Sequence, residues 1–156
     1  MPDPRVGIGF DVHPFGPGRV LWLGGVEFPG DEGLAGHSDG DVVCHAVADA
    51  LLGAAALGDV GGHFPDTDPS IRGIGGLDLL ARTVEILARE GLAPTSCDLT
   101  VICDRPPIDP RRGEMRANLA AALGLGLERV SVKATRPEGL GLRGEGIGCQ
   151  AVAMIR

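Results

Sequence analysis

The chain has 156 residues, of which 44% are hydrophobic, and its formal net charge is −7. This length fits one domain with a hydrophobic core, and this hydrophobic content excludes a disordered segment. Aromatic residues make up only 3% and tyrosine is absent, which together with the negative charge argues against a nucleic-acid partner. An acidic protein that acts on a polyanion must concentrate positive charge locally, and bound metal ions are one way to do so.

Cysteine usage points to a reducing compartment, and the hydropathy of the chain gives no sign of a membrane-spanning segment. The four cysteines form no C-x-x-C pair, and we expect reduced, buried thiols. No apolar run approaches the roughly 20 residues of a membrane-spanning helix, so we expect no membrane partner. We also expect no signal peptide, because the first strand pattern begins a few residues after Met1. With the high glycine content, these features favour a cytoplasmic protein of a bacterium.

Strands are predicted from runs of apolar residues, helices from apolar residues at helical spacing, and element ends from Gly and Pro. In chain order we expect a strand at 5–13, a hairpin at 19–28 that turns at Gly24-Gly25, a loop at 30–40, a helix that ends near Leu57, a loop at 58–76, a helix at 77–90 closed by Gly91, a strand at 97–104, a helix at 111–123, and strands at 129–135 and 148–155.

Two features of this order matter for function. Ser38 or Asp39 can cap the first helix. The segment 58–76 is so rich in Gly, Pro and Asp that we expect a functional loop there and no regular element. The whole order predicts an α+β fold, with one domain over residues 1–156 and a mixed sheet that carries its helices on one face.

The most informative pattern is Asp11-Val12-His13 inside the first strand. Side chains two residues apart on a strand point to the same face, so Asp11 and His13 can reach one ion. His45, in the first helix, offers a third ligand. One carboxylate, two imidazoles and an open fourth position are typical of a catalytic zinc site. The alternative is a plain Asp–His hydrogen bond at the end of a strand.

The segment from His37 to Asp41 suggests a phosphate site. The N-terminus of a helix offers free N–H groups and a partial positive charge, and His37 and Ser38 stand just before it. An ordinary capping loop is the equally weighted alternative. Asp49 lies on the same helix face as His45 and either orients its ring or is solvated.

Two later segments can also carry chemistry. Three acids in the loop 58–68 suit a cation or a hydroxyl-bearing ligand, although an Asp-turn loop is the favoured reading without further context, and His63 can be a packed loop residue. Glu138, at the end of the strand 129–135, can hold a second cation. Arg143 and Glu145 can form an exposed ion pair that contributes little.

Taken together, these motifs resemble one family over almost the whole chain. G-F-D-V-H, H-S-D-G-D-x-x-x-H, F-P-D-T-D, V-K-A-T-x-x-E and R-G-E-G occur in the order found in the 2-C-methyl-D-erythritol 2,4-cyclodiphosphate synthase family. The resemblance implies a homotrimer with active sites between subunits, one Zn²⁺ per subunit, and Mg²⁺ or Mn²⁺ as a second ion. It also implies a small-molecule substrate, a cytidylyl diphosphate.

The resemblance assigns roles residue by residue. It implies zinc ligands at Asp11, His13 and His45, the second-ion ligand at Glu138, and catalytic roles for His37 and Arg136. Arg136 stands where the family has a threonine, and Pro107 where it has a lysine. The implied substrate-binding residues are Asp11, His13, His37, Ser38, Asp59, Val60, Gly61, Phe64, Pro65, Asp66, Thr67 and Asp68, then Cys103, Asp104, Arg105, Pro106, Pro107, Ile108 and Asp109, and finally Thr135, Arg136, Pro137, Glu138, Leu142 and Arg143.

The implied reaction is an intramolecular phosphoryl transfer that closes a cyclic diphosphate and releases CMP. Its nucleophile is already an anion, so the demands are charge neutralisation and in-line orientation. Two other functions fit the zinc pattern. A zinc phosphoesterase would release inorganic phosphate, and an assembly protein would hold zinc in a closed site with four protein ligands. Only three plausible ligands lie near one another, which favours catalysis.

Overall fold

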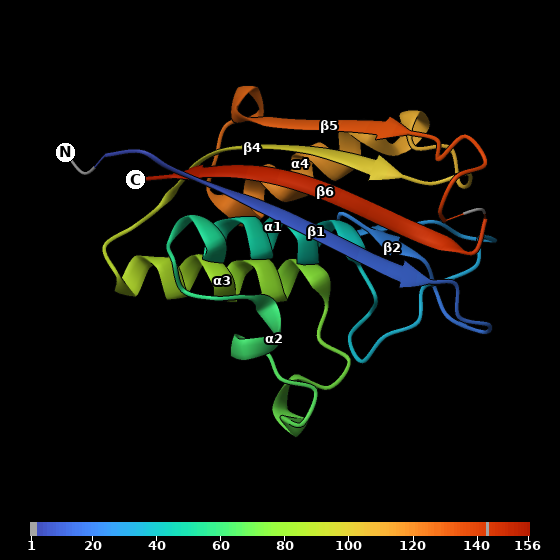
Figure 1. The fold of residues 1–156 in the computed structure, drawn as a ribbon, viewed down its shortest axis with the longest axis horizontal. Helices are drawn as coiled ribbons and strands as arrows, with labels where there is room; N and C mark the ends of the chain where they lie inside the picture. The colour runs from blue at the N-terminus through green and yellow to red at the C-terminus, as the bar shows by residue number, and fades with distance from the viewer. Residues whose placement is uncertain (1–2, 143) are drawn as a thin grey trace.

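Within residues 3–142 and 144–156, which the computed structural model describes, the chain forms one mixed four-stranded sheet and a separate hairpin. The sheet order is β1-β6-β4-β5, and only the β4–β5 pair is parallel (Figure 1). The strands are β1 Arg5–Pro14, β4 Pro94–Ile102, β5 Val130–Thr135 and β6 Gly146–Ile155, and the hairpin is β2 Trp22–Leu23 with β3 Val26–Glu27.

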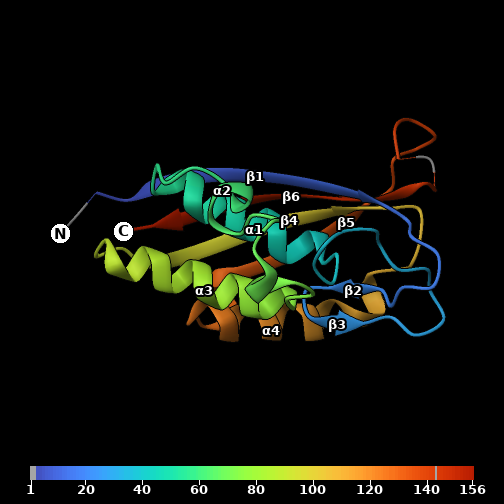
Figure 2. The same ribbon diagram turned by 90° about the horizontal axis from the view of Figure 1, so that it is seen from below.

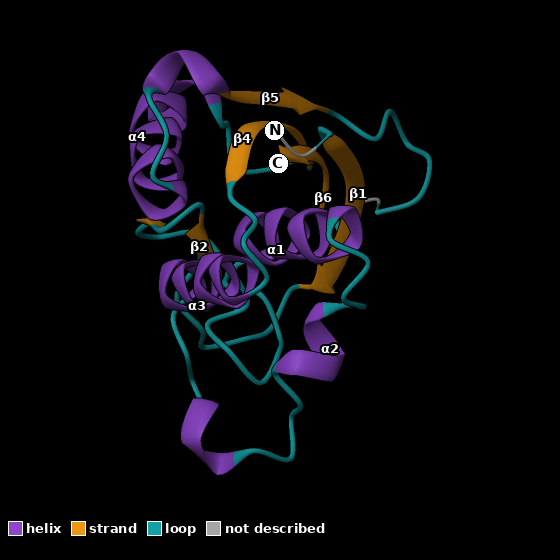
Figure 3. Cartoon of the chain, turned by 90° about the vertical axis from the view of Figure 1, so that its left-hand side faces the viewer, coloured by secondary structure: helices purple, strands orange, loops and turns teal. Residues whose placement is uncertain are grey.

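Three long helices lie on one side of this sheet (Figure 2). Helix α1 packs on β1 and β6, α3 packs on α1, and α4 packs on β5 (Figure 3). The predicted α+β class, with a mixed sheet and its helices on one face, is confirmed. The helices are α1 Val42–Ala54, the short α2 Val60–His63, α3 Gly76–Arg89 and α4 Arg112–Leu123, with 3₁₀ turns η1 Pro69–Ile71, η2 Asp109–Arg111 and η3 Leu127–Arg129.

The two faces of the sheet differ in burial. Residues that face the helices, such as Leu99, Ile147 and Ala151, are fully or almost fully buried. No helix of the described part of the chain covers the opposite face, which therefore exposes apolar side chains along its β1 and β6 half. We call these residues the open sheet face; they are Val6, Ile8, Phe10 and Val12 on β1 and Val152 and Met154 on β6.

Two glycines let α1 lie directly against β1. A Cβ atom at Gly7 would stand 2.0 Å from the Ala50 carbonyl oxygen, and one at Gly9 would stand 1.9 Å from that of Ala46. Any side chain at either position would push the helix away. The glycines therefore set the distance between β1 and α1, and His45 lies on the part of α1 that this contact fixes.

The first helix begins later and ends earlier than expected. Its cap is Asp41 rather than Ser38 or Asp39: the Asp41 carboxylate accepts from Cys44 N at 3.1 Å, and from Gly24 N and Gly25 N at 2.9 and 2.8 Å. Asp39 accepts instead from Gly76 N, at the start of α3, at 2.8 Å. The N-terminus of α1 is thus buried against the hairpin, which removes the basis for a phosphate site made by its own N–H groups.

Other boundaries shift by a few residues. Helix α1 ends at Ala54 and not near Leu57, with Ala56 in the left-handed region at φ 59°. The expected loop 58–76 contains α2 and the turn η1, so the prediction that it holds no regular element was wrong for those two short stretches. Gly91, at φ 72°, follows α3 as predicted.

The state of the cysteines agrees with the prediction of reduced, buried thiols. All four cysteines are free and buried in the described part of the chain. Burial raises the pKa of Cys97 to about 12 and that of Cys103 to about 11, so both are neutral thiols near neutral pH. No helix in residues 3–142 and 144–156 has the length and apolarity needed to cross a membrane.

Candidate active site

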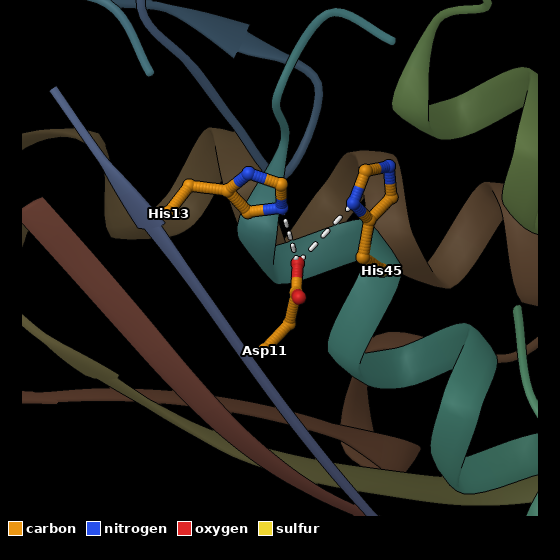
Figure 4. Close-up of side chains that lie close together, drawn as sticks. All are labelled: Asp11, His13 and His45. Atoms are coloured by element: carbon orange, nitrogen blue, oxygen red, sulfur yellow. Dashed lines mark hydrogen bonds and ion pairs between the residues drawn. The ribbon is translucent and has the colours of Figure 1, made fainter. Parts of the chain in front are cut away.

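The site is built around one carboxylate oxygen between two imidazoles (Figure 4). Asp11 Oδ2 lies 2.9 Å from Nε2 of His13 and 3.2 Å from Nδ1 of His45. Asp11 and His13 come from β1, and His45 comes from α1. The three ligand atoms lie within 4.8 Å of one another, and among the described residues this is the only such group that could hold a metal ion. The three side chains that the sequence predicted as ligands therefore meet.

Each imidazole has a second contact on the side away from Asp11. The Nδ1 atom of His13 lies 2.7 Å from the carbonyl oxygen of Ala35, which can only accept, so Nδ1 carries the hydrogen. The Nε2 atom of His45 lies 3.1 Å from the Ser38 hydroxyl, which also accepts from Gly40 N at 3.1 Å. These contacts leave Nε2 of His13 and Nδ1 of His45 as the atoms that face the Asp11 oxygen.

The charges of the cluster are coupled. Burial alone would raise the pKa of Asp11, but hydrogen bonds and charge attraction from His13 and His45 outweigh it and lower the pKa to about 2. The hydrogen bond to Asp11 in turn raises the pKa of His13. In the metal-free protein the proton on His13 thus stabilises this arrangement of side chains. A divalent cation could bind the same three side-chain atoms in place of the proton.

A cavity of about 630 Å³ opens beside the cluster. The main chain of segment 36–39 pairs with segment 73–74 at its wall, through Gly73 N to His37 O at 3.1 Å and Asp39 N to Ile74 O at 3.2 Å. Of the predicted site residues, those that line this cavity are Asp11, His13, His37, Ser38, His45, Asp59, Val60, Gly61, Phe64, Asp66, Thr67 and Asp68. Pro65 is not among its lining residues.

The acids of the 58–68 loop have different roles. Asp59 caps α2 by accepting from Gly62 N at 2.9 Å, and Asp68 accepts from Ser70 N at 2.9 Å, as in the Asp-turn interpretation. Asp66 is different, because its Oδ2 atom lies 3.4 Å from Nε2 of His37, and both side chains are exposed. The loop thus places His37 and Asp66 together at the cavity.

Asp49 and His63 both contact the backbone of the segment 57–60. Asp49 accepts from Val60 N at 2.7 Å and contacts neither ring nitrogen of His45, so neither prediction for this residue, orienting the ring or plain solvation, describes its role. Its half-buried carboxyl fixes the start of α2, and burial raises its pKa. His63 Nε2 lies 2.7 Å from the carbonyl oxygen of Leu57, but the residue is exposed, so the packed-histidine interpretation was wrong.

A second cavity of about 400 Å³ lies where β4 and β5 end. Its lining includes the predicted residues Cys103, Asp104, Pro106, Pro107, Ile108, Asp109, Thr135 and Arg136. Pro137, Glu138 and Leu142 line neither cavity, and Arg143 lies outside the described residues. Glu138 is exposed, has a φ of 55°, and is not part of the metal-ligand group.

Arg105 is the one member of the predicted 103–109 segment that does not line the second cavity. Its guanidinium donates to Gly144 O at 3.1 Å, pairs with Glu32 at 3.3 Å and lies 4.3 Å from the Phe15 ring centre. Arg105 therefore links the nucleotide segment predicted from the sequence to two neighbouring loops.

The two cavities belong to opposite edges of the sheet. The register aligns Asp11 with Cys149, Cys149 with Val101, and Val101 with Ala134, so the β1 and β5 positions are level but three strands apart. At a strand spacing near 4.8 Å, this separation is about 14 Å. One chain therefore presents a metal-ligand cavity at one edge and a separate cavity at the other.

Several lining residues gave no signal in the sequence. Gly36, Ile71, Arg72, Ile74 and Leu79 border the first cavity, yet no motif marked them. Ile71, Arg72 and Ile74 meet Gly36 because the 58–76 segment folds back against the 36–39 segment, and Leu79 follows on α3. Pairing between segments so far apart in the chain leaves no periodic pattern that could be read in advance.

Three side chains that could hold a metal ion lie beside a cavity, and the described residues supply no fourth member of the group. This arrangement on an α+β fold is typical of the catalytic sites of enzymes that use a metal ion. A family model described as the YgbB family matches residues 4–156. The chain therefore belongs to the YgbB family.

The relatives and solved structures agree with this assignment. A 2-C-methyl-D-erythritol 2,4-cyclodiphosphate synthase of Symbiobacterium thermophilum is 55% identical over 152 residues, which cover 96% of this chain and 97% of the relative. One of Salinibacter ruber is 53% identical over 154 residues, covering 97% and 98%. A solved structure of a synthase of this name, in a CDP-bound form, matches with a TM-score of 0.90 at 34% identity and covers 97% of this chain and 100% of that one. The predicted family and enzyme class are confirmed.

Proposed function

We propose that the protein converts 4-diphosphocytidyl-2-C-methyl-D-erythritol 2-phosphate into 2-C-methyl-D-erythritol 2,4-cyclodiphosphate and CMP, with residues 1–156 acting as one synthase domain. The observation that carries this proposal is the Asp11–His13–His45 group at the wall of a cavity, in a chain whose close relatives bear the name of this synthase. The reaction belongs to the non-mevalonate route to isoprenoid precursors.

The ligand group fits zinc in its donor chemistry. One carboxylate and two neutral imidazoles are common zinc ligands, and each imidazole has its far nitrogen held by Ala35 O or Ser38 Oγ. With three protein ligands, a fourth position is left for a phosphate oxygen. When bound, zinc supplies positive charge and polarises phosphate oxygens.

The surrounding residues orient the substrate and neutralise its charge. His37 and Ser38 line the cavity beside the ligand group and can donate to the phosphate oxygens that gain charge in the transition state. The backbone and side chains from Asp59 to Asp68 can hold the methylerythritol hydroxyl groups. Arg136, in the second cavity, can place a permanent positive charge on the diphosphate.

A homotrimer explains why the two cavities lie on opposite sheet edges. The substrate must reach both the metal ligands and the nucleotide segment, so the β5 edge of one copy would meet the β1 edge of the next. The open sheet face supports association, since Val6 and Ile8 are each 65% exposed and Phe10 is 55% exposed in the single chain. A closed ring of three copies would bury this apolar surface.

The nucleotide is assigned to the second cavity. The segment from Cys103 to Asp109 can bind the cytidine. A structural relative is described in a CDP-bound form. Glu138 is proposed as the protein ligand of a Mg²⁺ or Mn²⁺ ion that binds mainly through substrate phosphates. The four free, buried cysteines support a place in the bacterial cytoplasm.

The direct test is incubation of the purified protein and of His13→Ala with the cytidylyl substrate, zinc and magnesium. We expect CMP and a cyclic diphosphate from the wild-type protein, and a large loss of both activity and zinc in His13→Ala. Release of inorganic phosphate instead would favour the zinc phosphoesterase. A protein that held zinc but released neither product would favour the assembly function.

A further inference from the structure

Arg19 holds the segment that carries His37 and Ser38. Its Nη1 atom donates to the carbonyl oxygen of Gly36 at 2.6 Å, and its Nη2 atom donates to that of Ser38 at 2.5 Å. These two carbonyls belong to the residues before and after His37, so one planar guanidinium binds the backbone on both sides of His37. A fork with two donors fixes both position and orientation, which a single contact would not.

The charge of this guanidinium is not neutralised by an ion pair. Among the described residues, no carboxylate lies within ion-pair distance of Arg19, and both of its hydrogen bonds go to neutral carbonyl oxygens. The side chain is half-buried, and the chain as a whole carries a net charge of −7. Arg19 therefore keeps a permanent positive charge behind a segment at the wall of the first cavity.

The hydrogen bonds of Ser38 explain why the position of this segment matters. Its hydroxyl contacts His45 Nε2 at 3.1 Å, so a shift of the Ser38 backbone would also disturb the ring that offers Nδ1 to a metal. His37 in turn reaches Asp66 on the opposite loop at 3.4 Å. The Arg19 contacts thus act on both side chains.

We propose that Arg19 is a positioning residue, which fixes the His37–Ser38 pair for the substrate phosphate and supplies positive charge behind it. This inference rests on the proposed function for its substrate, but its structural part does not. No sequence motif marks Arg19, because the residue lies in the predicted hairpin and its two acceptors lie on a different loop.

The test compares Arg19→Met and Arg19→Lys with a matched control, Arg116→Met. Arg116 also donates to two carbonyl oxygens, those of Val130 at 2.7 Å and Leu127 at 2.6 Å, but neither acceptor residue lines either cavity. Each protein is examined by hydrogen exchange of the 35–41 segment, by zinc content, by thermal midpoint, and by kcat and KM for CMP release.

In Arg19→Met we expect hydrogen exchange in the 35–41 segment to rise about tenfold, because two charged hydrogen bonds are lost. We expect kcat to fall about tenfold with a smaller change in KM, since a misplaced donor pair weakens the transition state most. Arg19→Lys keeps the charge and one donor and should lie between wild type and Arg19→Met. Arg116→Met should match wild type in segment exchange and in kcat.

Hydrogen exchange and the kinetics of CMP release test this inference and the proposed function separately. If the wild-type protein released no CMP, the proposed function would fail, while the exchange of segment 35–41 would still test the Arg19 contacts. The inference is overturned if Arg19→Met and Arg116→Met show the same exchange in this segment. It is also overturned if the wild-type protein is active and the two variants share its kcat.

Discussion

The hydroxyl of Ser38 and the Nε2 atom of His45 lie 3.1 Å apart, on the side of the imidazole away from Asp11. A metal on Nδ1 requires the hydrogen on Nε2, and the Ser38 oxygen is placed to accept it. The contact therefore couples the proposed phosphate-binding pair to the proposed metal ligands, so that a displacement of one group also displaces the other.

Removal of this hydroxyl should weaken zinc binding. We expect Ser38→Ala to lower the affinity for zinc by about tenfold, the lower end of the range for the loss of a hydrogen bond to a metal-ligating histidine. Competition with a chromophoric chelator measures the affinity. Thermal midpoints of the zinc-free proteins provide the control, and an unchanged zinc affinity would show that His45 needs no orienting partner.

Gly9 should be intolerant of a side chain. Gly9→Ala places a Cβ 1.9 Å from the Ala46 carbonyl oxygen, so α1 must move away from β1, and we expect a loss of about 1–3 kcal/mol in the free energy of unfolding together with weaker zinc binding. The matched control is Gly53→Ala on the same helix, whose Cβ would lie 3.8 Å from its nearest neighbour, Ile8 O.

Denaturant unfolding and zinc titration distinguish the two glycine variants. Gly53→Ala should be neutral or stabilised by up to about 1 kcal/mol, because alanine is the better helix former. If Gly9→Ala kept wild-type stability and zinc affinity, the close approach of α1 would not determine where His45 lies.

Assembly should depend on the open sheet face. Phe10→Glu introduces a charge at a side chain that is 55% exposed in the single chain, and we expect it to convert the proposed trimer into smaller species at micromolar concentration. Leu127→Glu is the matched control, since Leu127 is 50% exposed but lies on η3, away from that face. Sedimentation velocity measures both, and a Phe10→Glu trimer would contradict the proposed arrangement.

The stability of the zinc-free protein should fall as pH rises. The pKa of His13 is raised above 6.5 in the folded protein, so its contribution is present below pH 6.5 and is lost as pH rises through the folded value. The pKa of Asp11 is lowered to about 2, so its contribution is complete above pH 3.8 and is lost only in strong acid.

Between about pH 6 and pH 8, only the His13 term of this pair therefore changes. We expect the thermal midpoint of chelator-treated protein to decrease over this interval, and Asp11→Asn to show a smaller decrease because it lacks the charged partner. With saturating zinc the trend should reverse, since zinc competes with the proton for His13. Identical pH profiles for wild type and Asp11→Asn would contradict the coupling.

Glu138 should affect the second ion and not the zinc. We expect Glu138→Gln to keep its zinc and its assembly but to lose activity severalfold at low magnesium, with part of the loss restored at high magnesium or manganese by mass action. The measurement is CMP release against metal concentration. Activity equal to wild type at limiting magnesium would make Glu138 a turn residue only.

The sequence by itself determined the metal-ligand group and most elements. Asp11 and His13 share a strand face because side chains alternate along β1, and the apolar spacing of α3 and the glycine at position 91 predicted that helix to within one residue. The start of α1 does not follow from the sequence, because Ser38, Asp39 and Asp41 are all good caps and only their contacts distinguish them.

The tertiary structure alone decided how the loops meet. Asp39 reaches the start of α3, Asp41 reaches the hairpin turn, and Arg19 reaches Gly36 and Ser38, each across a long stretch of chain. It also decided that the metal-ligand cavity and the second cavity lie on opposite edges of the sheet. Contacts between side chains and distant backbone groups have no period in the sequence, so they become visible only when packing has brought the segments together.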